Sequence, residues 1–177
     1  MSPSPRVVQE ILLPEVTGFV ASHKADVPKW TVYLPDSIPI DTAIVFFRQF
    51  QNAGCLNLAV YAEAARGDWP KRDIGVEVGP DGPVRIVTEF TQSYSEELNK
   101  FRDRDFPPSQ SLFVATCQLS ELGGVLPLLL AMSDQKHVRL QETGGTHGMA
   151  AQRYVSVLEH LKKLGVTSVS FYGVYVE

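Results

Sequence analysis

The residues with the clearest potential for chemistry lie in the stretch ETGGTHGMAAQRY, where three glycines, a histidine and two threonines precede a predicted helix. Glycines in front of a helix let backbone N–H groups point at an anion, and the helix dipole adds to the attraction. The spacing of Gly144, Gly145 and Gly148 fits neither G-x-x-x-x-G-K-[ST] nor G-x-G-x-x-G. We therefore favour a structural interpretation, a glycine turn with Thr146 as the N-cap of a helix that begins near Met149.

The alternative interpretation is a cofactor loop. Residues 139–172, RLQETGGTHGMAAQRYVSVLEHLKKLGVTSVSFY, resemble the strand, glycine loop, helix and strand of the acyl-CoA-dependent N-acetyltransferases of the GNAT superfamily. The resemblance implies a pyrophosphate loop at 141–148, with Gln141, Gly144, Gly145 and Gly148 as cofactor-binding residues. Its motif, Q/R-x-x-G-x-G/A, is half present, because Thr146 occupies the last small-residue position. A transferase needs a cleft with open N–H groups at the start of the 149–164 helix, whereas an interaction domain would close this loop with its own hydrogen bonds.

Other kinds of catalytic site are not supported by the sequence. The four histidines, at positions 23, 137, 147 and 160, lack the short-range partners of a readable metal site. The two cysteines form no C-x-x-C pair, and no G-x-S-x-G nucleophile elbow occurs. We therefore predict no catalytic residue, no metal site and no resident cofactor, and an enzyme is the less favoured class.

One aromatic residue stands out as a candidate for protein binding. Trp69 lies in RGDWPKRD, a polar loop with charges on both sides. An exposed tryptophan beside Arg or Lys is a common interface anchor. The alternative is that the ring folds back over a sheet edge and serves packing alone.

The bulk composition favours one ordinary globular domain. The chain has 177 residues, 44% of them apolar and 20% charged, and its net charge is −4. Lys and Arg are scattered, so we expect no nucleic-acid groove. The longest apolar block, GGVLPLLLAM, is too short to span a membrane, and we expect a soluble chain. Cys55 and Cys117 lie in apolar runs, which favours free thiols in a reducing, intracellular compartment over a single buried disulfide.

Strands and helices alternate along the chain, with one hairpin among them. Strands are predicted at 16–23, 29–34, 55–64, 111–119, 137–142 and 166–176, and a hairpin around GPDGP at 74–90. Helices are predicted at 41–54 with Asp41 as N-cap, at 93–104 with a Ser93–Glu96 capping box, at 120–135 and at 149–165. Pro127 is compatible with the third helix only if that helix begins near residue 126.

These elements predict a single α/β (or α+β) domain over residues 13–177, with a mixed sheet, packed helices and the embedded hairpin. Residues 1–12 are predicted to be an N-terminal tail or an artificial start of the chain. The passages AIVFFRQFQNAGCLNLAVYAEA and YVSVLEHLKKLGVTSVSFYGVY share the order helix, glycine, strand. They are compatible with two related halves, although helix–Gly–strand junctions are common in α/β proteins.

Residues 30–61 and 161–177, WTVYLPDSIPIDTAIVFFRQFQNAGCLNLAVY and LKKLGVTSVSFYGVYVE, resemble the folded C-terminal region of the apicomplexan immune mapped proteins. The resemblance implies a parasite antigen held at the cytoplasmic face of the plasma membrane by an acylated N-terminal segment, which is missing here. It implies no catalytic residues and transfers no site residues. We therefore expect a non-enzymatic protein-interaction or antigenic domain whose partner is a protein.

Overall fold

The computed structural model describes residues 6–7, 30–34, 37–52, 54, 58–62, 74–89, 96–103, 112–133, 136–142 and 149–172. Six of the described strands form a mixed sheet in the order β3-β9-β8-β5-β6-β7. Their bounds are β3 Ile38–Pro39, β5 Ile74–Val78, β6 Val84–Glu89, β7 Leu112–Cys117, β8 His137–Glu142 and β9 Ser168–Tyr172. A smaller parallel sheet has the order β1-β2-β4, with β1 Arg6–Val7, β2 Trp30–Leu34 and β4 Leu58–Ala62.

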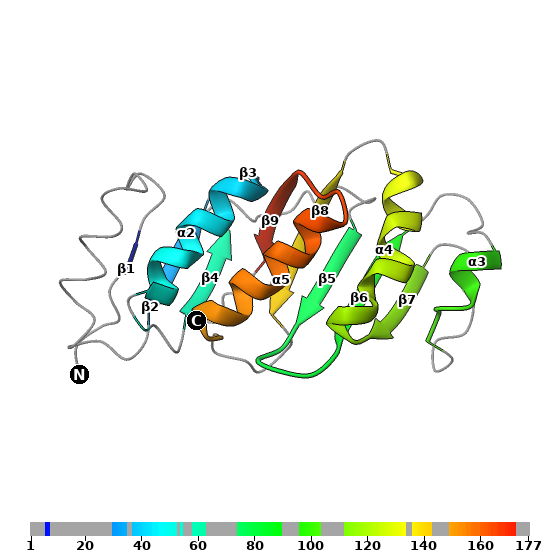
Figure 1. The fold of residues 1–177 in the computed structure, drawn as a ribbon, viewed down its shortest axis with the longest axis horizontal. Helices are drawn as coiled ribbons and strands as arrows, with labels where there is room; N and C mark the ends of the chain where they lie inside the picture. Colours follow the sequence, from blue (N-terminus) through cyan, green and yellow to red (C-terminus); the bar gives the residue numbers. More distant parts are fainter. Residues whose placement is uncertain are drawn as a thin grey trace.

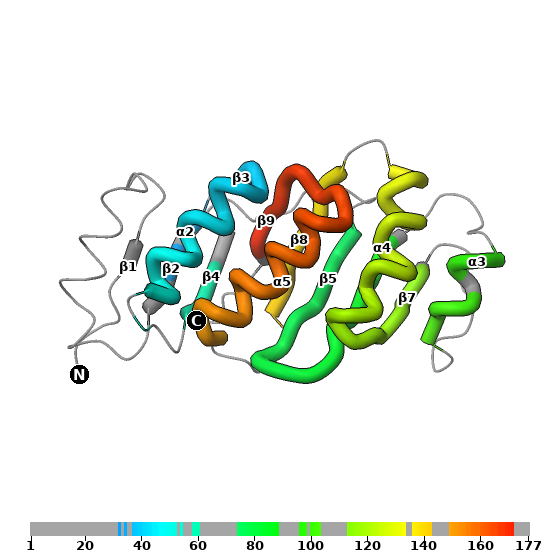
Figure 2. The backbone as a smooth tube through the Cα atoms, viewed as in Figure 1, coloured from blue at the N-terminus to red at the C-terminus, as the bar shows by residue number. Residues whose placement is uncertain are grey.

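Helices cover one face of this arrangement. They are α2 Ile40–Asn52, α3 Glu96–Asn99, α4 Leu122–Ala131 and α5 Ala151–Lys163, with a 3-10 turn at Leu119–Glu121. In Figure 1, α2, α5 and α4 all lie on the viewer's side of the strands, with α2 beside α5. The same side-by-side course of α2 and α5 can be followed in the backbone tube of Figure 2. The predicted α/β class with a mixed sheet is therefore confirmed, in a single compact body.

The sequence predicts the local elements of the larger sheet well. The hairpin is confirmed: β5 and β6 are antiparallel, with Glu77 opposite Arg85. Strand β8 has the predicted bounds, and it pairs in parallel with both β5 and β9. The predicted strand at 16–23 lies outside the described residues.

The two passages of similar sequence fold as similar units. Helix α2 connects the parallel strands β2 and β4, and α5 connects the parallel strands β8 and β9. Each helix is followed by a glycine with positive φ, Gly54 at 78° and Gly165 at 104°. A left-handed residue after the last turn is the usual way to end a helix, and glycine adopts it without a steric penalty.

Three predicted helix starts are wrong. Helix α4 begins at Leu122, so Pro127 lies inside it and removes the hydrogen bond that its N–H would give to Gly123. Packing compensates, because Val125, Leu126 and Leu129 on one side of this helix are buried. Asp41 lies in the first turn of α2 instead of at its N-cap, since the helix begins one residue earlier.

The third error is the N-cap of α5. It is Ala150, with an extended backbone and no side-chain cap, instead of Thr146. The preceding residue, Met149, pairs with Leu58 of β4 in a two-bond antiparallel bridge, with N···O distances of 2.7 and 3.0 Å. This bridge fixes the entry of the chain into the helix, so tertiary contact takes the place of a capping side chain.

The hydrophobic core is continuous across both sheets and the four described helices. Phe47 of α2 lies at its centre, where its ring stacks on Tyr154 of α5 and packs against Phe46 and Phe171. Within the described ranges, no helix is long and apolar enough to cross a membrane.

Candidate functional site

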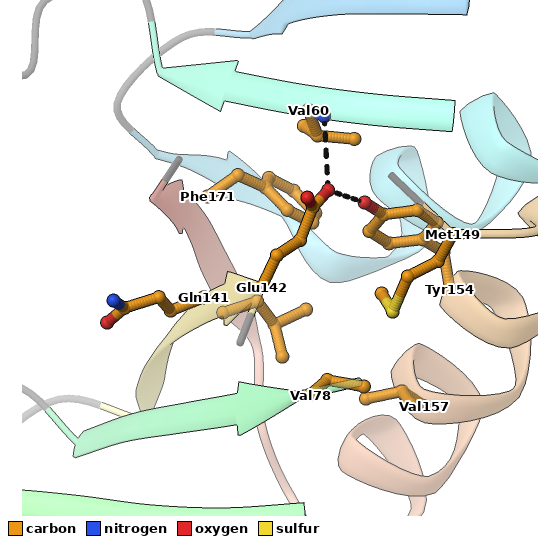
Figure 3. Close-up of a pocket in the computed structure, with 9 residues that line it drawn as sticks. Val60, Val78, Gln141, Glu142, Met149, Tyr154, Val157 and Phe171 are labelled. Atoms are coloured by element: carbon orange, nitrogen blue, oxygen red, sulfur yellow. Dashed lines mark hydrogen bonds between the residues drawn. The ribbon is translucent and has the colours of Figure 1, made fainter. Parts of the chain in front are cut away.

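The end of β8 meets β4 and α5 at a small polar junction surrounded by apolar side chains (Figure 3). The Glu142 carboxylate reaches from the end of β8 toward β4, where its Oε1 accepts a hydrogen bond from the backbone N–H of Val60 at 3.3 Å. The Tyr154 hydroxyl of α5 donates to the same oxygen. This carboxylate therefore ties the larger sheet to the smaller sheet and to the helix layer.

The positions of the protons at this junction follow from the donors present. The Tyr154 oxygen also lies 3.0 Å from the carbonyl of Leu58, but a tyrosine hydroxyl has only one proton to donate. That carbonyl already accepts the N–H of Met149. Two donors converging on one carboxylate oxygen suit an ionised Glu142, which accepts a charge-assisted hydrogen bond from the Tyr154 hydroxyl.

The cavity lined by the described residues beside this junction is small. Traced by the centre of a water-sized sphere it measures about 10 Å³, which is room for about one water molecule. Apart from Gln141, Glu142 and Tyr154, its lining is apolar: Val60, Val78, Leu140, Met149, Val157 and Phe171. Among the described residues, the arrangement suits a structural link between layers.

The residues predicted to hold a pyrophosphate are only partly described. Gly144, Gly145 and Gly148 lie outside the described residues, as do Trp69, His147 and Cys55. Gln141 is described, and it faces away from Glu142 and the start of α5, as Figure 3 shows. At the described end of the loop, Met149 and Ala151 are buried, and the N–H of Met149 is used in the bridge to Leu58.

The cysteine and histidine positions offer no reactive constellation in the part of the chain that is described. Burial raises the pKa of the Cys117 thiol, and the nearby carboxylates of Glu121 and Asp103 raise it further. Cys117 is a free thiol. Within the ranges that the structure describes, no group of three or more His, Cys, Asp or Glu side chains could hold a metal ion.

The surface of α4 differs from that of the other long helices, and the sequence analysis missed its significance. Gly123, Gly124, Pro127 and Ala131 form its outward side, which we call the outer face of α4; all four are exposed. Beside it, Phe101 and Met132 remain 38% and 46% exposed. The signal in the sequence is the absence of any charged residue from 122 to 133, in a predicted helix too short to span a membrane.

Comparisons of this chain with protein-family models, with curated proteins and with solved structures find no match.

Proposed function

We propose that this chain is a non-enzymatic protein-interaction domain that binds its partner through the outer face of α4. One observation carries the proposal: α4 is apolar on all sides, yet one side of it is exposed. A helix that is apolar all round is normally buried, and contiguous exposed apolar surface marks interaction sites.

The neighbouring helices make the contrast clear. Helices α2 and α5 carry charged outer sides, and two ion pairs join them, Arg48 with Glu159 and Asp41 with Lys162. These charges keep that part of the helix layer compatible with water. On the outer face of α4, the Phe101 ring lies close to Gly124, where an added Cβ would be 3.4 Å from it. Phe101 and Met132 add larger exposed apolar side chains to the small residues of this face. Aromatic and methionine side chains of this kind are enriched in interfaces.

The junction at Glu142 supports an interaction domain over the acyl-CoA alternative. A transferase needs open N–H groups and a cleft where α5 begins. Instead, Met149 is buried and hydrogen-bonded to Leu58, and the adjacent cavity has room for about one water molecule. Gln141, the first residue of the alternative cofactor loop, points to the other side of β8.

The proposal extends to cellular location. A reducing, intracellular compartment, and at full length the cytoplasmic face of a plasma membrane, is what the resemblance to immune mapped proteins implies. The free thiol at Cys117 supports a reducing compartment. Rapid alkylation of the protein in intact cells followed by mass spectrometry should find two alkylated cysteines, and a disulfide-linked pair would refute this part of the proposal.

Binding through α4 can be tested with a matched pair of charge substitutions. Ala131→Glu places a carboxylate on the outer face of α4, and Gln152→Glu adds the same charge on the exposed side of α5. We expect proximity labelling in the cells of origin to give the same partners with the wild-type chain and with Gln152→Glu, and to lose them with Ala131→Glu. Unchanged labelling by Ala131→Glu, in a variant with wild-type melting temperature, would overturn the proposal.

The enzyme alternative has its own test, thermal denaturation with and without about 1 mM acetyl-CoA. A ligand at about 100 times its dissociation constant adds roughly 2.7 kcal/mol to the free energy of unfolding, a shift of several degrees for a domain of this size. We expect no shift. A clear shift would favour the transferase and the loop at 141–148.

A further inference from the structure

Strand β7 is the last strand of the six-stranded sheet, and we call its side away from β6 the β7 edge. Among the described strands β7 pairs only with β6, and Figure 1 shows it at the end of the sheet. The outer backbone groups of such a strand can pair with a strand of another chain. The sequence of β7, LFVATC, includes Phe, Val and Thr, which favour strands, and it has no charge, proline or glycine.

The sequence around β7 offers no electrostatic protection of this edge. Residues 106–120 contain no charged side chain. Two antiparallel copies of β7 would therefore meet without repulsion between like charges. Proteins commonly protect an edge strand with a charged residue, a proline or a covering segment, because an unprotected edge joins to other chains. In this chain the protecting charges come from residues outside the strand.

Asp103 occupies the β7 edge with both its backbone and its side chain. Its N–H donates to the carbonyl of Val114 at 2.7 Å, and its Oδ1 accepts the N–H of Thr116 at 2.8 Å. Its Oδ2 accepts the hydroxyl of Thr116 as well. Val114 and Thr116 are alternate residues, so their backbone groups point to the same side of the strand. Asp103 therefore takes the place that a residue of an added strand would take.

A second carboxylate occupies the next alternate donor along the chain. The N–H of Gln118, two residues after Thr116, donates to Oε1 of Glu121 at 3.0 Å. Two successive alternate N–H groups are thus bonded to carboxylates instead of to the carbonyls of a strand. The segment that carries Asp103 is itself held in place, because the Phe101 ring packs on α4, where a Cβ added at Gly124 would be 3.4 Å from it.

We propose that the β7 edge is a surface for antiparallel pairing with β7 of a second copy of this chain, and that Asp103 and Glu121 keep it closed. An added strand needs the Val114 carbonyl and the amides of Thr116 and Gln118, and all three are occupied. It would also have to displace two charged groups or remove them from water, which is costly. None of these groups belongs to the outer face of α4, so the two surfaces are distinct.

The experiment measures self-association of the purified chain by sedimentation velocity at increasing protein concentration. Asp103→Ala removes the carboxylate from the β7 edge, and Asp81→Ala, the matched control, removes the same side chain from the exposed turn between β5 and β6. We expect the dimer dissociation constant of Asp103→Ala to be at least about tenfold lower than those of the wild type and of Asp81→Ala.

Two further variants distinguish pairing at the β7 edge from association caused by misfolding. Thr116→Lys places a charge on an exposed residue of this edge, so its addition to Asp103→Ala should raise the dissociation constant back toward that of the wild type. Glu121→Ala frees only the Gln118 amide, so it should promote association less than Asp103→Ala does. It also tests the proposal if Asp103→Ala fails to fold, which circular dichroism would reveal.

Amide hydrogen exchange identifies the strand that pairs. In Asp103→Ala, exchange of the Thr116 N–H should slow as the protein concentration rises, because the dimer gives this group a new acceptor. The proposal is overturned if neither Asp103→Ala nor Glu121→Ala, when folded, associates more than Asp81→Ala. It is also overturned if Thr116→Lys leaves the dimer of Asp103→Ala intact, or if that dimer forms without slower exchange at Thr116.

Discussion

Replacing Tyr154 by phenylalanine removes one hydroxyl from the junction between the two sheets and leaves the ring in place. The ring stacks on Phe47 with centroids 4.8 Å apart, so the apolar packing is retained. The lost group is the donor to Glu142. A hydrogen bond to a charged partner contributes about 1.5–3 kcal/mol to the free energy of unfolding. For a domain of this length each kcal/mol corresponds to about 2–4 °C, so we expect the melting temperature of Tyr154→Phe to fall by about 3–12 °C.

The assay is chemical and thermal denaturation of four proteins: wild type, Tyr154→Phe, Glu142→Gln and the double variant. Because the two side chains share one hydrogen bond, the double variant should lose less stability than the sum of the single variants. Thr167→Val is the control, since its hydroxyl donates to the Lys136 carbonyl at 3.2 Å on the surface, and it should change stability by less than about 0.5 kcal/mol. If Tyr154→Phe is as mild as this control, the reasoning about the junction is wrong.

Three further predictions each concern one or two residues. Gly165→Ala places a side chain on a residue with φ of 104° and should lower the free energy of unfolding by about 1–2 kcal/mol. Gly123→Ala, at an exposed position in α4, should raise it by about 0.5–1 kcal/mol. Urea denaturation measures both changes. Cys117, whose pKa is raised, should react with iodoacetamide at neutral pH more slowly than a small free thiol, as peptide-resolved mass spectrometry would reveal; equal rates would contradict the assignment. Breaking the exposed pair of Asp41 and Lys162 with Lys162→Met should cost less than about 1 kcal/mol and less still in high salt, and a larger loss would mean that the pair is not solvent-screened.

The fold was predictable where local sequence signals and tertiary packing agree. The hairpin around GPDGP has turn residues and flanking β-branched residues that need no distant partner to be recognised. Strand β8, His137–Glu142, alternates apolar and polar residues because one of its faces is buried and the other is not. Helix α5 carries its apolar residues at helical spacing, and those residues are the ones buried against the sheets.

Prediction failed where a distant contact replaced a local signal. Thr146 fits the sequence rule for an N-cap, but the start of α5 is fixed by the bridge between Met149 and Leu58, two residues that lie 91 positions apart in the sequence. Pro127 fits the rule for a first helical turn, but burial of the apolar face of α4 extends the helix past it toward the N-terminus. Single-residue propensities of about 1–3 kcal/mol are small beside the burial of several large side chains.

Two features of the structure were hidden from sequence reasoning for different physical reasons. The outer face of α4 leaves no periodic signal in the sequence, because both sides of this helix lack charged residues. Only the fold shows which side of the helix is exposed. The contacts of His137 with Ser168 and Ser170 are invisible for the opposite reason: these are ordinary polar residues of two strands, and they meet only through the register of β8 and β9. In both cases the decisive property, the exposure of a helix face or the register of two strands, is set by the tertiary structure. A change that shifted the register of β9 would separate His137 from Ser168 and Ser170 while leaving the outer face of α4 in place.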